Sequence, residues 1–327
     1  MQARWPRSNP APLLPALLKV TPEDFEVHER LSFEPSGEGE HLLLQVSKTG
    51  IGTPELGRLL ADAHGIDHVD VGYAGMKDKR AVTRQWFSLR GVAELDDAVE
   101  TIDGVRVLRQ ARHRQKLRRG ELEANDFRIR LRSVDPVAGL AAANRLGETG
   151  APNYFGAQRF GWDNLKKATA WLAQRRRRRI SRFKQGLYLS VLRSFLFNEV
   201  LAHRVGAGNW HRVMEGDCLD SRGYPTGPLW GRGRSETDAL AAVLEAAALT
   251  PHQAILEGLE HAGLKQARRS LLLWPEAFSC VALDDGIELS FSLGPGEYAT
   301  SLLMDRFELD TGTAELVTEV QAAGGGR

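Results

Sequence analysis

Residues 72–86 read GYAGMKDKRAVTRQW, a segment that contains two glycines and no apolar periodicity. Glycine and short polar runs favour turns. The residues VDV at 69–71, before the segment, and TRQWFSLR at 83–90, which overlaps its end, are typical of strands. The segment is therefore predicted to be a loop between two extended stretches, and this loop carries Asp78.

Asp78 is surrounded by cations, because Lys77 and Lys79 flank it and Arg80 and Arg84 follow. Neighbouring positive charge favours the ionised form of a carboxyl group, so Asp78 is expected to be a carboxylate at neutral pH. That state suits a nucleophile or an ion-pair partner and does not suit a general acid. Aspartate is also common in turns for structural reasons, and the spacing alone does not choose among these roles.

Strand and helix patterns continue on both sides of this loop. EHLLLQV at 40–46 predicts a strand, and Thr53 followed by Pro54 predicts a helix N-cap and the first helical residue. FRIRLR at 127–132 alternates apolar residues with arginine, as a half-buried strand does. We expect its arginines to extend a basic surface.

Helical periodicity dominates the middle of the chain, and strand-like alternation returns over 278–307. The helical patterns are LKKATAWLAQRR at 165–176, SVLRSFLFNEVLAHRV at 190–205, ETDALAAVLEAAAL at 236–249 and PHQAILEGLEHAGL at 251–264. The Gly/Pro-rich residues 221–234 predict an irregular exposed segment. The order of patterns predicts an α+β protein in which 1–150 and 273–327 form one domain and 151–272 form an inserted, mostly helical domain.

Composition indicates a globular protein, with 327 residues of which 42% are hydrophobic and 26% are charged. Cys218 and Cys280 are isolated, which argues against a disulfide framework or a Cys/His zinc site and is typical of a reducing compartment. Prolines interrupt the apolar N-terminal patch, and no other apolar run approaches about 18 residues. We therefore expect a cytoplasmic protein with no membrane segment.

The formal net charge is only +1, but the charges are segregated along the chain. Residues 104–120 hold seven Lys or Arg and no acid, and residues 159–184, which include the run Arg175–Arg179, hold ten against one acid. Either run alone is most simply a solvated face. Two such runs favour a nucleic-acid partner, because contacts with phosphate supply most of a salt-sensitive affinity.

Several catalytic signatures are absent from the sequence: the GxxxxGK[ST] phosphate loop, the GxSxG elbow and the HExxH helix. Two alternatives stand beside an enzyme that uses Asp78 as a nucleophile. A magnesium-dependent nuclease needs convergent carboxylates, and Asp67 and Asp70 are the acids nearest to Asp78 in sequence. A catalytically silent RNA-binding protein needs no such groups.

Residues 72–86 resemble the signature loop of the TruD family of tRNA pseudouridine synthases. The likeness continues in order through KVTPEDFEVHE at 19–29, GEGEHLLLQVSKTG at 37–50, ARHRQKLRRGELEANDFRIRLR at 111–132, APNYFGAQRFG at 151–161, RSFLFNEVLAHRV at 193–205 and GEYATSLLMDRF at 296–307. The resemblance implies a pseudouridine synthase core, a mixed, mainly antiparallel sheet flanked by helices, with an inserted helical domain. It also implies isomerisation of uridine 13 of tRNA to pseudouridine, without a metal, another cofactor or an obligate protein partner.

The same resemblance assigns a catalytic residue. Asp78 matches the family's catalytic aspartate, and whether it attacks C6 of the uracil or C1′ of the ribose stays open. Lys77 and Arg80 beside it are candidates for contacting phosphate or balancing the charge of Asp78.

Further positions match residues that line the family's uridine pocket: Phe25, Asn125 and Phe127. Lys19 and Glu29 flank Phe25 in a similar motif. Tyr298 stands where this family usually has Phe, so stacking on a base is retained and a hydroxyl is added.

Overall fold

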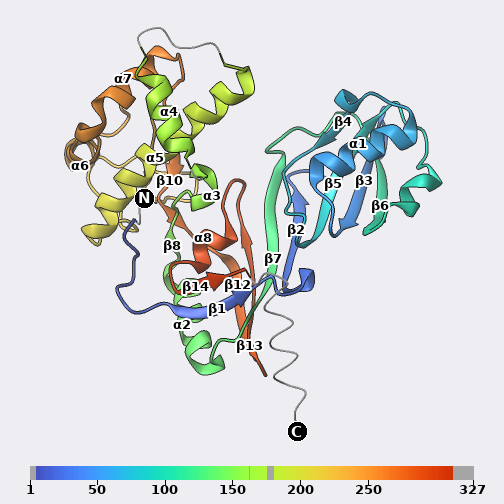
Figure 1. Cartoon of the computed structure of the whole chain (residues 1–327), viewed down its shortest axis with the longest axis horizontal. Helices are drawn as coiled ribbons and strands as arrows, with labels where there is room; N and C mark the ends of the chain where they lie inside the picture. Colours follow the sequence, from blue (N-terminus) through green and yellow to red (C-terminus); the bar gives the residue numbers. More distant parts are fainter. Residues whose placement is uncertain (1–4, 162, 175–179, 312–327) are drawn as a thin grey trace. The chain divides into compact units, whose positions relative to one another are not determined.

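The structure, a computed structural model, describes residues 5–161, 163–174 and 180–311. These residues form two compact units, and Figure 1 labels helices and strands of both. Unit 1 contains residues 5–12, 149–161, 163–174, 180–274 and 300–305, whereas unit 2 contains residues 13–148, 275–299 and 306–311. The basic run Arg175–Arg179 lies outside the described residues.

Unit 2 is built on a ten-stranded sheet. Seven of its strands lie in the order β12 (Glu276–Leu283), β13 (Gly286–Leu293), β7 (Leu122–Arg132), β2 (Phe25–Leu31), β5 (Val82–Arg90), β3 (His41–Lys48) and β6 (Val105–His113). β1 (Leu14–Leu18) pairs with β7 and with β14 (Phe307–Asp310), and β4 (Val71–Tyr73) pairs with β5. The β2–β5 and β1–β14 pairs are parallel and the other pairs are antiparallel, so the predicted mixed, mainly antiparallel sheet is confirmed.

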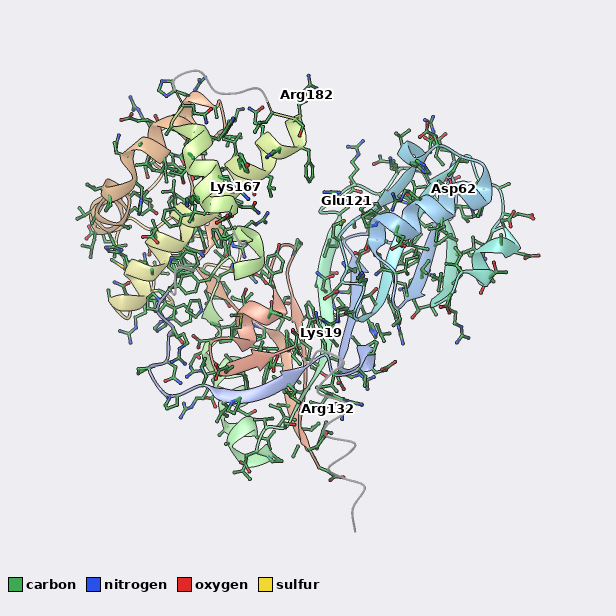
Figure 2. The ribbon with its side chains drawn as sticks, viewed as in Figure 1. Lys19, Asp62, Glu121, Arg132, Lys167 and Arg182 are labelled. Carbon is green, nitrogen blue, oxygen red and sulfur yellow. The ribbon has the colours of Figure 1, made fainter. Side chains whose placement is uncertain are left out.

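Strand β7 buries its apolar residues as the alternation predicts, but its arginines do not form a free basic surface. Arg128 pairs with Glu26 of β2, and Arg130 pairs with Glu288 of β13 at 2.6 Å. Arg132, labelled in Figure 2, pairs with Asp24 and Asp285. The expectation that these arginines extend a basic surface was wrong, because acidic side chains of neighbouring elements pair with them.

Helix α1 (Thr53–His64) packs on strands β3 and β5, and Leu60 and Phe87 share its buried cluster. Helix α2 (Pro136–Thr149) packs on β13, where Gly139 lies against Ile287. Gly52 occupies the N-cap of α1, so Thr53 is the first helical residue and not the predicted cap. The Thr53 hydroxyl instead accepts a hydrogen bond from the backbone amide of Lys77 in the 74–80 loop.

The loop that carries Asp78 follows a strand that is displaced along the sequence from the predicted one. The extended stretch predicted at 69–71 begins two residues later as β4, after the 3-10 helix η2 (His68–Asp70), because the Asp67 carboxylate caps that helix. Residues 74–80 then contain neither helix nor strand, as predicted. Glycine at position 75 leaves room for the ammonium of Lys77, because a Cβ there would lie 2.9 Å from its Nζ.

Unit 1 is mostly helical, and α5 (Arg182–Gly206) forms its centre. The other helices are α3 (Ala157–Phe160), α4 (Asn164–Leu172), α6 (Ala239–Leu249) and α7 (Gln253–His261), while α8 (Ala299–Leu303) starts at the end of unit 2 and continues into unit 1. Leu192, Leu196 and Val200 of α5 pack with apolar residues of α4, α6 and α7. The periodicity in the middle of the sequence therefore predicted these longer helices correctly.

The stretch Ala239–His261 is long and apolar enough in composition to pass for a membrane span, and 33% of its most apolar 18 residues are buried. The fold divides this stretch into α6, the 3-10 helix η4 (Thr250–His252) and α7. Leu249, Ile255 and Leu259 from it lie in the core of unit 1. Its apolar character therefore serves the packing of that core.

The Gly/Pro-rich segment 221–234 is partly a buried strand, contrary to the prediction. β9 (Thr226–Leu229) pairs antiparallel with β10 (Ala267–Ser270), and residues 225–228 are buried. A Cβ on Gly227 would lie 2.8 Å from the side chain of Leu271, so only glycine lets the strand approach the core this closely. A second small pair joins β8 (Ala151–Pro152) to β11 (Leu272–Leu273).

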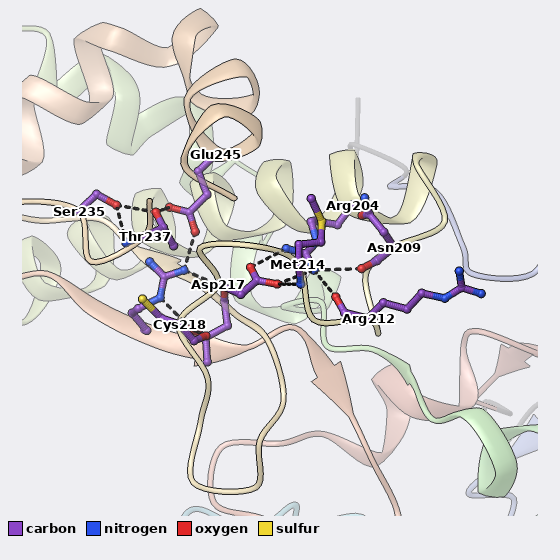
Figure 3. A network of polar contacts seen from close by, with 11 residues as sticks. Arg204, Asn209, Arg212, Met214, Asp217, Cys218, Ser235, Thr237 and Glu245 are labelled. Carbon is purple, nitrogen blue, oxygen red and sulfur yellow. Dashed lines mark hydrogen bonds and ion pairs between the residues drawn. The ribbon is translucent and has the colours of Figure 1, made fainter. Parts of the chain in front are cut away.

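Buried ion pairs hold the irregular part of unit 1 (Figure 3). Arg204 of α5 bonds both carboxylate oxygens of Asp217 at 2.8 and 3.1 Å, and it also donates to the carbonyl oxygens of residues 209 and 212. Arg268 of β10 pairs with Glu245 of α6 at 2.5 Å. Charged groups are stable inside a protein only when they are paired in this way, so the pairs fix a segment that has little regular structure.

Candidate active site

Asp78 forms an ion pair with Lys19 in unit 2. Oδ2 of Asp78 lies 2.5 Å from Nζ of Lys19, and Oδ1 accepts a hydrogen bond of 3.0 Å from the backbone amide of Arg80. The Asp78 side chain is 43% exposed, whereas that of Lys19 is 10% exposed. The carboxylate is thus held in a defined orientation and remains accessible from outside.

Lys19 reaches Asp78 from an unusual backbone conformation. It follows β1 and precedes the 3-10 helix η1 (Pro22–Asp24), and Figure 2 labels it. Its φ of 60° is left-handed, which is rare for a residue with a side chain. Its Nζ also lies 4.1 Å from the ring centroid of Phe25, within the range of a cation–π contact. Such conformations are enriched at functional sites, and here the conformation accompanies the contact between the Lys19 ammonium and Asp78.

The pKa of Asp78 is lowered from its ordinary value. Burial by itself raises the pKa of Asp78, but the hydrogen bonds from Lys19 and from the amide of Arg80, with the charges of both residues, outweigh burial. Asp78 is therefore ionised at neutral pH, as the sequence predicts.

Buried aromatic rings lie beside this ion pair. Phe25 of β2 meets Phe127 of β7 edge to face at 6.0 Å, and Phe127 stacks on Phe291 of β13 at 5.5 Å. The three strands are neighbours in the sheet, and Phe127 and Phe291 are directly paired. Phe291 was missed in the sequence, because the SFS triplet around it reads as an ordinary alternating strand.

Asn125 lies on β7 two residues before Phe127, so both side chains leave the same face of the strand. Its Oδ1 is buried and has no hydrogen-bond partner among the described residues. A buried acceptor without a partner costs free energy unless another molecule supplies a donor.

Lys77, a candidate for contacting phosphate or balancing the charge of Asp78, pairs instead with Glu29. Nζ of Lys77 lies 2.5 Å from Oε2 of Glu29, and both side chains are buried. Oε1 of Glu29 accepts a hydrogen bond of 3.1 Å from the backbone amide of Trp86. This buried pair therefore ties the residue before Asp78 to strands β2 and β5.

Tyr298 is the site candidate that the structure does not join to the others. It is 42% exposed and lies between β13 and α8. Among the described residues, no hydrogen bond or ring contact links Tyr298 with Asp78, Phe25 or Phe127.

No group of three His, Cys, Asp or Glu side chains suited to a metal ion occurs in the part of the chain that the structure describes. Asp67, one of the carboxylates considered for a magnesium site, caps η2. The structure therefore offers no cluster of metal ligands around Asp78 within the described ranges.

The basic run at 104–120 is partly used by the fold itself. Three of its side chains bond protein groups: Arg112 the carbonyl oxygens of residues 92 and 93, Arg114 the carboxylate of Glu38 and Lys116 the carbonyl of residue 69. The exposed side chains of Arg106 and Arg118 form no hydrogen bond or ion pair with other described residues. These two cations are thus available to an external anion.

Comparison with known proteins shows the family to which the chain is similar. A family model described as tRNA pseudouridine synthase D (TruD) matches residues 14–174. The chain is 42% identical to the tRNA pseudouridine synthase D of Methylococcus capsulatus over 90% of this chain and 91% of that one. It is 40% identical to that of Aeromonas hydrophila over 92% and 94%. A solved structure titled as the putative tRNA pseudouridine synthase D of Methanosarcina mazei matches with a TM-score of 0.69 over 92% of this chain and 95% of that chain, and at 21% identity it supports the fold alone.

Identity of this level over nine-tenths of the chain defines the class, which is that of the pseudouridine synthases acting on tRNA. Within that class the chain belongs to the tRNA pseudouridine synthase D family. The family resemblance seen in the sequence is thereby confirmed.

Proposed function

We propose that this enzyme converts uridine 13 of tRNA to pseudouridine, with Asp78 as the nucleophile and without a cofactor. The observation that carries the proposal is the ion pair between Asp78 and Lys19 beside the rings of Phe25 and Phe127. It combines an ionised, accessible carboxylate with an apolar wall.

The wall suits a uridine that has left its stack. Unstacking a base costs a few kcal/mol, and an apolar aromatic surface together with phosphate contacts offsets that cost. We assign the surface to Phe25 and Phe127, whose side chains are 6% and 9% exposed, and a further ring to Tyr298, which is 42% exposed. The unpartnered Oδ1 of Asn125 is an acceptor, and N3–H of uracil is a donor that matches it.

The reaction is an isomerisation, so it needs no oxidant or second substrate. Asp78 attacks C6 of the uracil or C1′ of the ribose, the bond between C1′ and N1 breaks, and the uracil turns. C5 then bonds to C1′, C5 loses its proton, N1 gains one, and the carboxylate of Asp78 is released. Covalent attachment divides one difficult rearrangement into easier steps, and a cation such as Lys19 stabilises negative charge on the detached uracil.

We assign this chemistry to the domain formed by 1–150 and 273–327, and tRNA binding in part to the domain at 151–272. The first of these holds every site residue named above, within unit 2. Residues 5–12 and 300–305 pack with unit 1, so contacts within the chain draw a slightly different boundary. We expect Arg106 and Arg118 of unit 2 to contact phosphate.

We place the protein in the cytoplasm, where tRNA is modified and thiols stay reduced. Both cysteines are free, and burial raises the pKa of Cys280 to about 11 and also raises that of Cys218. Neither thiol is therefore activated for disulfide chemistry.

The test is to incubate an unmodified tRNA transcript with the protein and to map pseudouridine at position 13, with and without EDTA. A transcript carrying cytidine 13 is the matched control. Product at uridine 13 in both conditions, with full-length RNA, supports the proposal. Strand cleavage that EDTA abolishes would favour the nuclease, and bound RNA without product would favour the silent RNA-binding protein.

A further inference from the structure

The loop that carries Asp78 is tied to buried side chains outside the candidate site. The residues on either side of Asp78 each have a main-chain group bonded to residues 50–53, which span the turn after β3 and the first residue of α1. Before Asp78, the amide of Lys77 donates to Oγ1 of Thr53 at 2.9 Å. After Asp78, the carbonyl of Lys79 accepts from the amide of Gly50 at 2.8 Å.

Thr53 is part of a buried chain of hydrogen bonds. Its hydroxyl accepts from the amide of Lys77 and donates to Oε1 of Gln85 at 2.8 Å. Nε2 of Gln85 donates in turn to the carbonyl of Gly75 at 2.6 Å. Both side chains are fully buried, so water does not replace these bonds. The loop is therefore held at residues 75, 77 and 79.

The direction of each bond leaves little freedom. The backbone amide of Lys77 only donates, so the Thr53 hydroxyl must direct its own proton to Oε1 of Gln85. The backbone carbonyl of Gly75 only accepts, so Nε2 of the Gln85 side chain must face it. Gly52, and not Thr53, caps the helix. The Thr53 hydroxyl thus serves the loop and not its own helix.

The segment that makes these contacts is itself anchored. Nζ of Lys48 donates to the carbonyl of Ile51 at 2.9 Å, and the Lys48 side chain is fully buried. A buried lysine bonded to backbone is costly to place, which indicates that the conformation of this turn is specified. Thr53 therefore holds the loop from a fixed position.

We propose that Thr53 and Gln85 are positioning residues, which hold the 74–80 loop so that the carboxylate of Asp78 stays aligned with Lys19. Neither residue touches Asp78, and both act through the loop backbone. The effect on turnover rests on the proposed function, whereas the effect on the loop does not. A small misplacement of a reacting group costs up to about a hundredfold in rate. Loss of the hydrogen bonds from Thr53 and Gln85 to the loop therefore lowers kcat more than it affects RNA binding.

Thr53→Val tests the inference, because it removes the hydroxyl and keeps the shape of the side chain. Thr53→Ser keeps the hydroxyl. Thr83→Val is the matched control, since Thr83 is also fully buried in unit 2 and its hydroxyl has no hydrogen-bond partner among the described residues. Gln85→Leu breaks the same chain at its other member.

The first readout is hydrogen exchange of the amides of residues 74–80. We expect faster exchange there in Thr53→Val and Gln85→Leu, with exchange elsewhere unchanged, and exchange like the wild type in Thr53→Ser and Thr83→Val. Unchanged exchange in Thr53→Val overturns the inference whatever its activity. A wild type that forms no pseudouridine refutes the proposed function, and the exchange data still decide whether Thr53 holds the loop.

The second readout is pseudouridine formation at saturating tRNA. We expect kcat of Thr53→Val to fall roughly ten- to a hundredfold with an unchanged Kd for tRNA, and Thr53→Ser to recover it. Faster loop exchange with an unchanged kcat would overturn the positioning role. A fall in kcat that Thr53→Ser does not recover would also contradict it.

Discussion

Nζ of Lys19 lies 2.5 Å from Oδ2 of Asp78 across 59 residues of sequence. Lys19 lies on the short connection between β1 and η1, and Asp78 lies on the loop between β4 and β5. The left-handed backbone at Lys19 and the bonded loop around Asp78 bring the two charges together. This pair both ionises and orients the group that we assign as the nucleophile.

Replacing Lys19 by Met should change the pH dependence of the reaction. The pKa of Asp78 is held below its ordinary value partly by Lys19, so removing the ammonium raises it. The acidic limb of the kcat profile should move to higher pH, and kcat at neutral pH should fall about tenfold or more, since a charge-assisted hydrogen bond is worth roughly 1.5–3 kcal/mol. Lys79→Met, which removes a neighbouring exposed cation, is the control. An acidic limb that stays in place would contradict this role of Lys19.

Arg106→Glu combined with Arg118→Glu should weaken tRNA binding and flatten its dependence on salt. Each lost phosphate contact removes about one unit from the slope of log affinity against log salt. Arg130→Ala is the control, because Arg130 is already paired with Glu288. Equal slopes for the double variant and the wild type would remove this patch from the RNA footprint.

Asp217→Ala should destabilise unit 1 by about 3–5 kcal/mol, because it leaves the guanidinium of Arg204 buried without its partner. Urea denaturation measures the change. Lys167→Ala removes an exposed i,i+4 contact with Asp163 and should cost no more than about 0.5 kcal/mol. Similar costs for the two variants would mean that the Arg204–Asp217 pair is not a major support of the fold.

The stability of the wild type relative to Lys48→Met should depend on pH. Burial lowers the pKa of Lys48 from 10.5 to about 8, so between these values the folded state binds fewer protons than the unfolded state. The stability of the wild type relative to the variant should therefore rise from pH 8 to 10.5, by at most about 1.4 kcal/mol per pH unit, and stay level below pH 7. Denaturant titrations at several pH values measure the difference. A difference in stability between wild type and Lys48→Met that does not change with pH would show that Lys48 is hydrated.

Local chemistry was enough to predict part of the site from sequence. The Asp78 loop follows from its glycines and charges, and the strands β3, β5 and β7 follow from their composition and alternation. The roles of Phe25, Asn125 and Phe127 came only from the family resemblance, because a single aromatic or amide in a strand has no signature of its own.

Other features depend on partners far away in sequence, and the local pattern does not contain them. From the sequence alone, Arg128 and Arg130 are expected to form a basic surface. Strand pairing places Glu26 and Glu288 beside them, and the charges are paired. Thr53 looks like a helix cap because Pro54 follows it, and the local pattern does not reveal its hydrogen-bond partner, the amide of Lys77, which lies 24 residues away. In β9, Gly227 and its neighbouring prolines look irregular because the close packing that requires glycine comes from tertiary structure.

The most direct test of the central claim compares the wild type, Asp78→Asn and Asp70→Asn for pseudouridine at position 13 of tRNA, with tRNA affinity measured for each. Asp78→Asn keeps the size of the side chain and removes the nucleophilic charge, whereas Asp70→Asn removes an acid of the preceding segment. We predict product from the wild type and Asp70→Asn, none from Asp78→Asn, and similar affinities for all three. Product formed by Asp78→Asn at the wild-type rate would contradict the account.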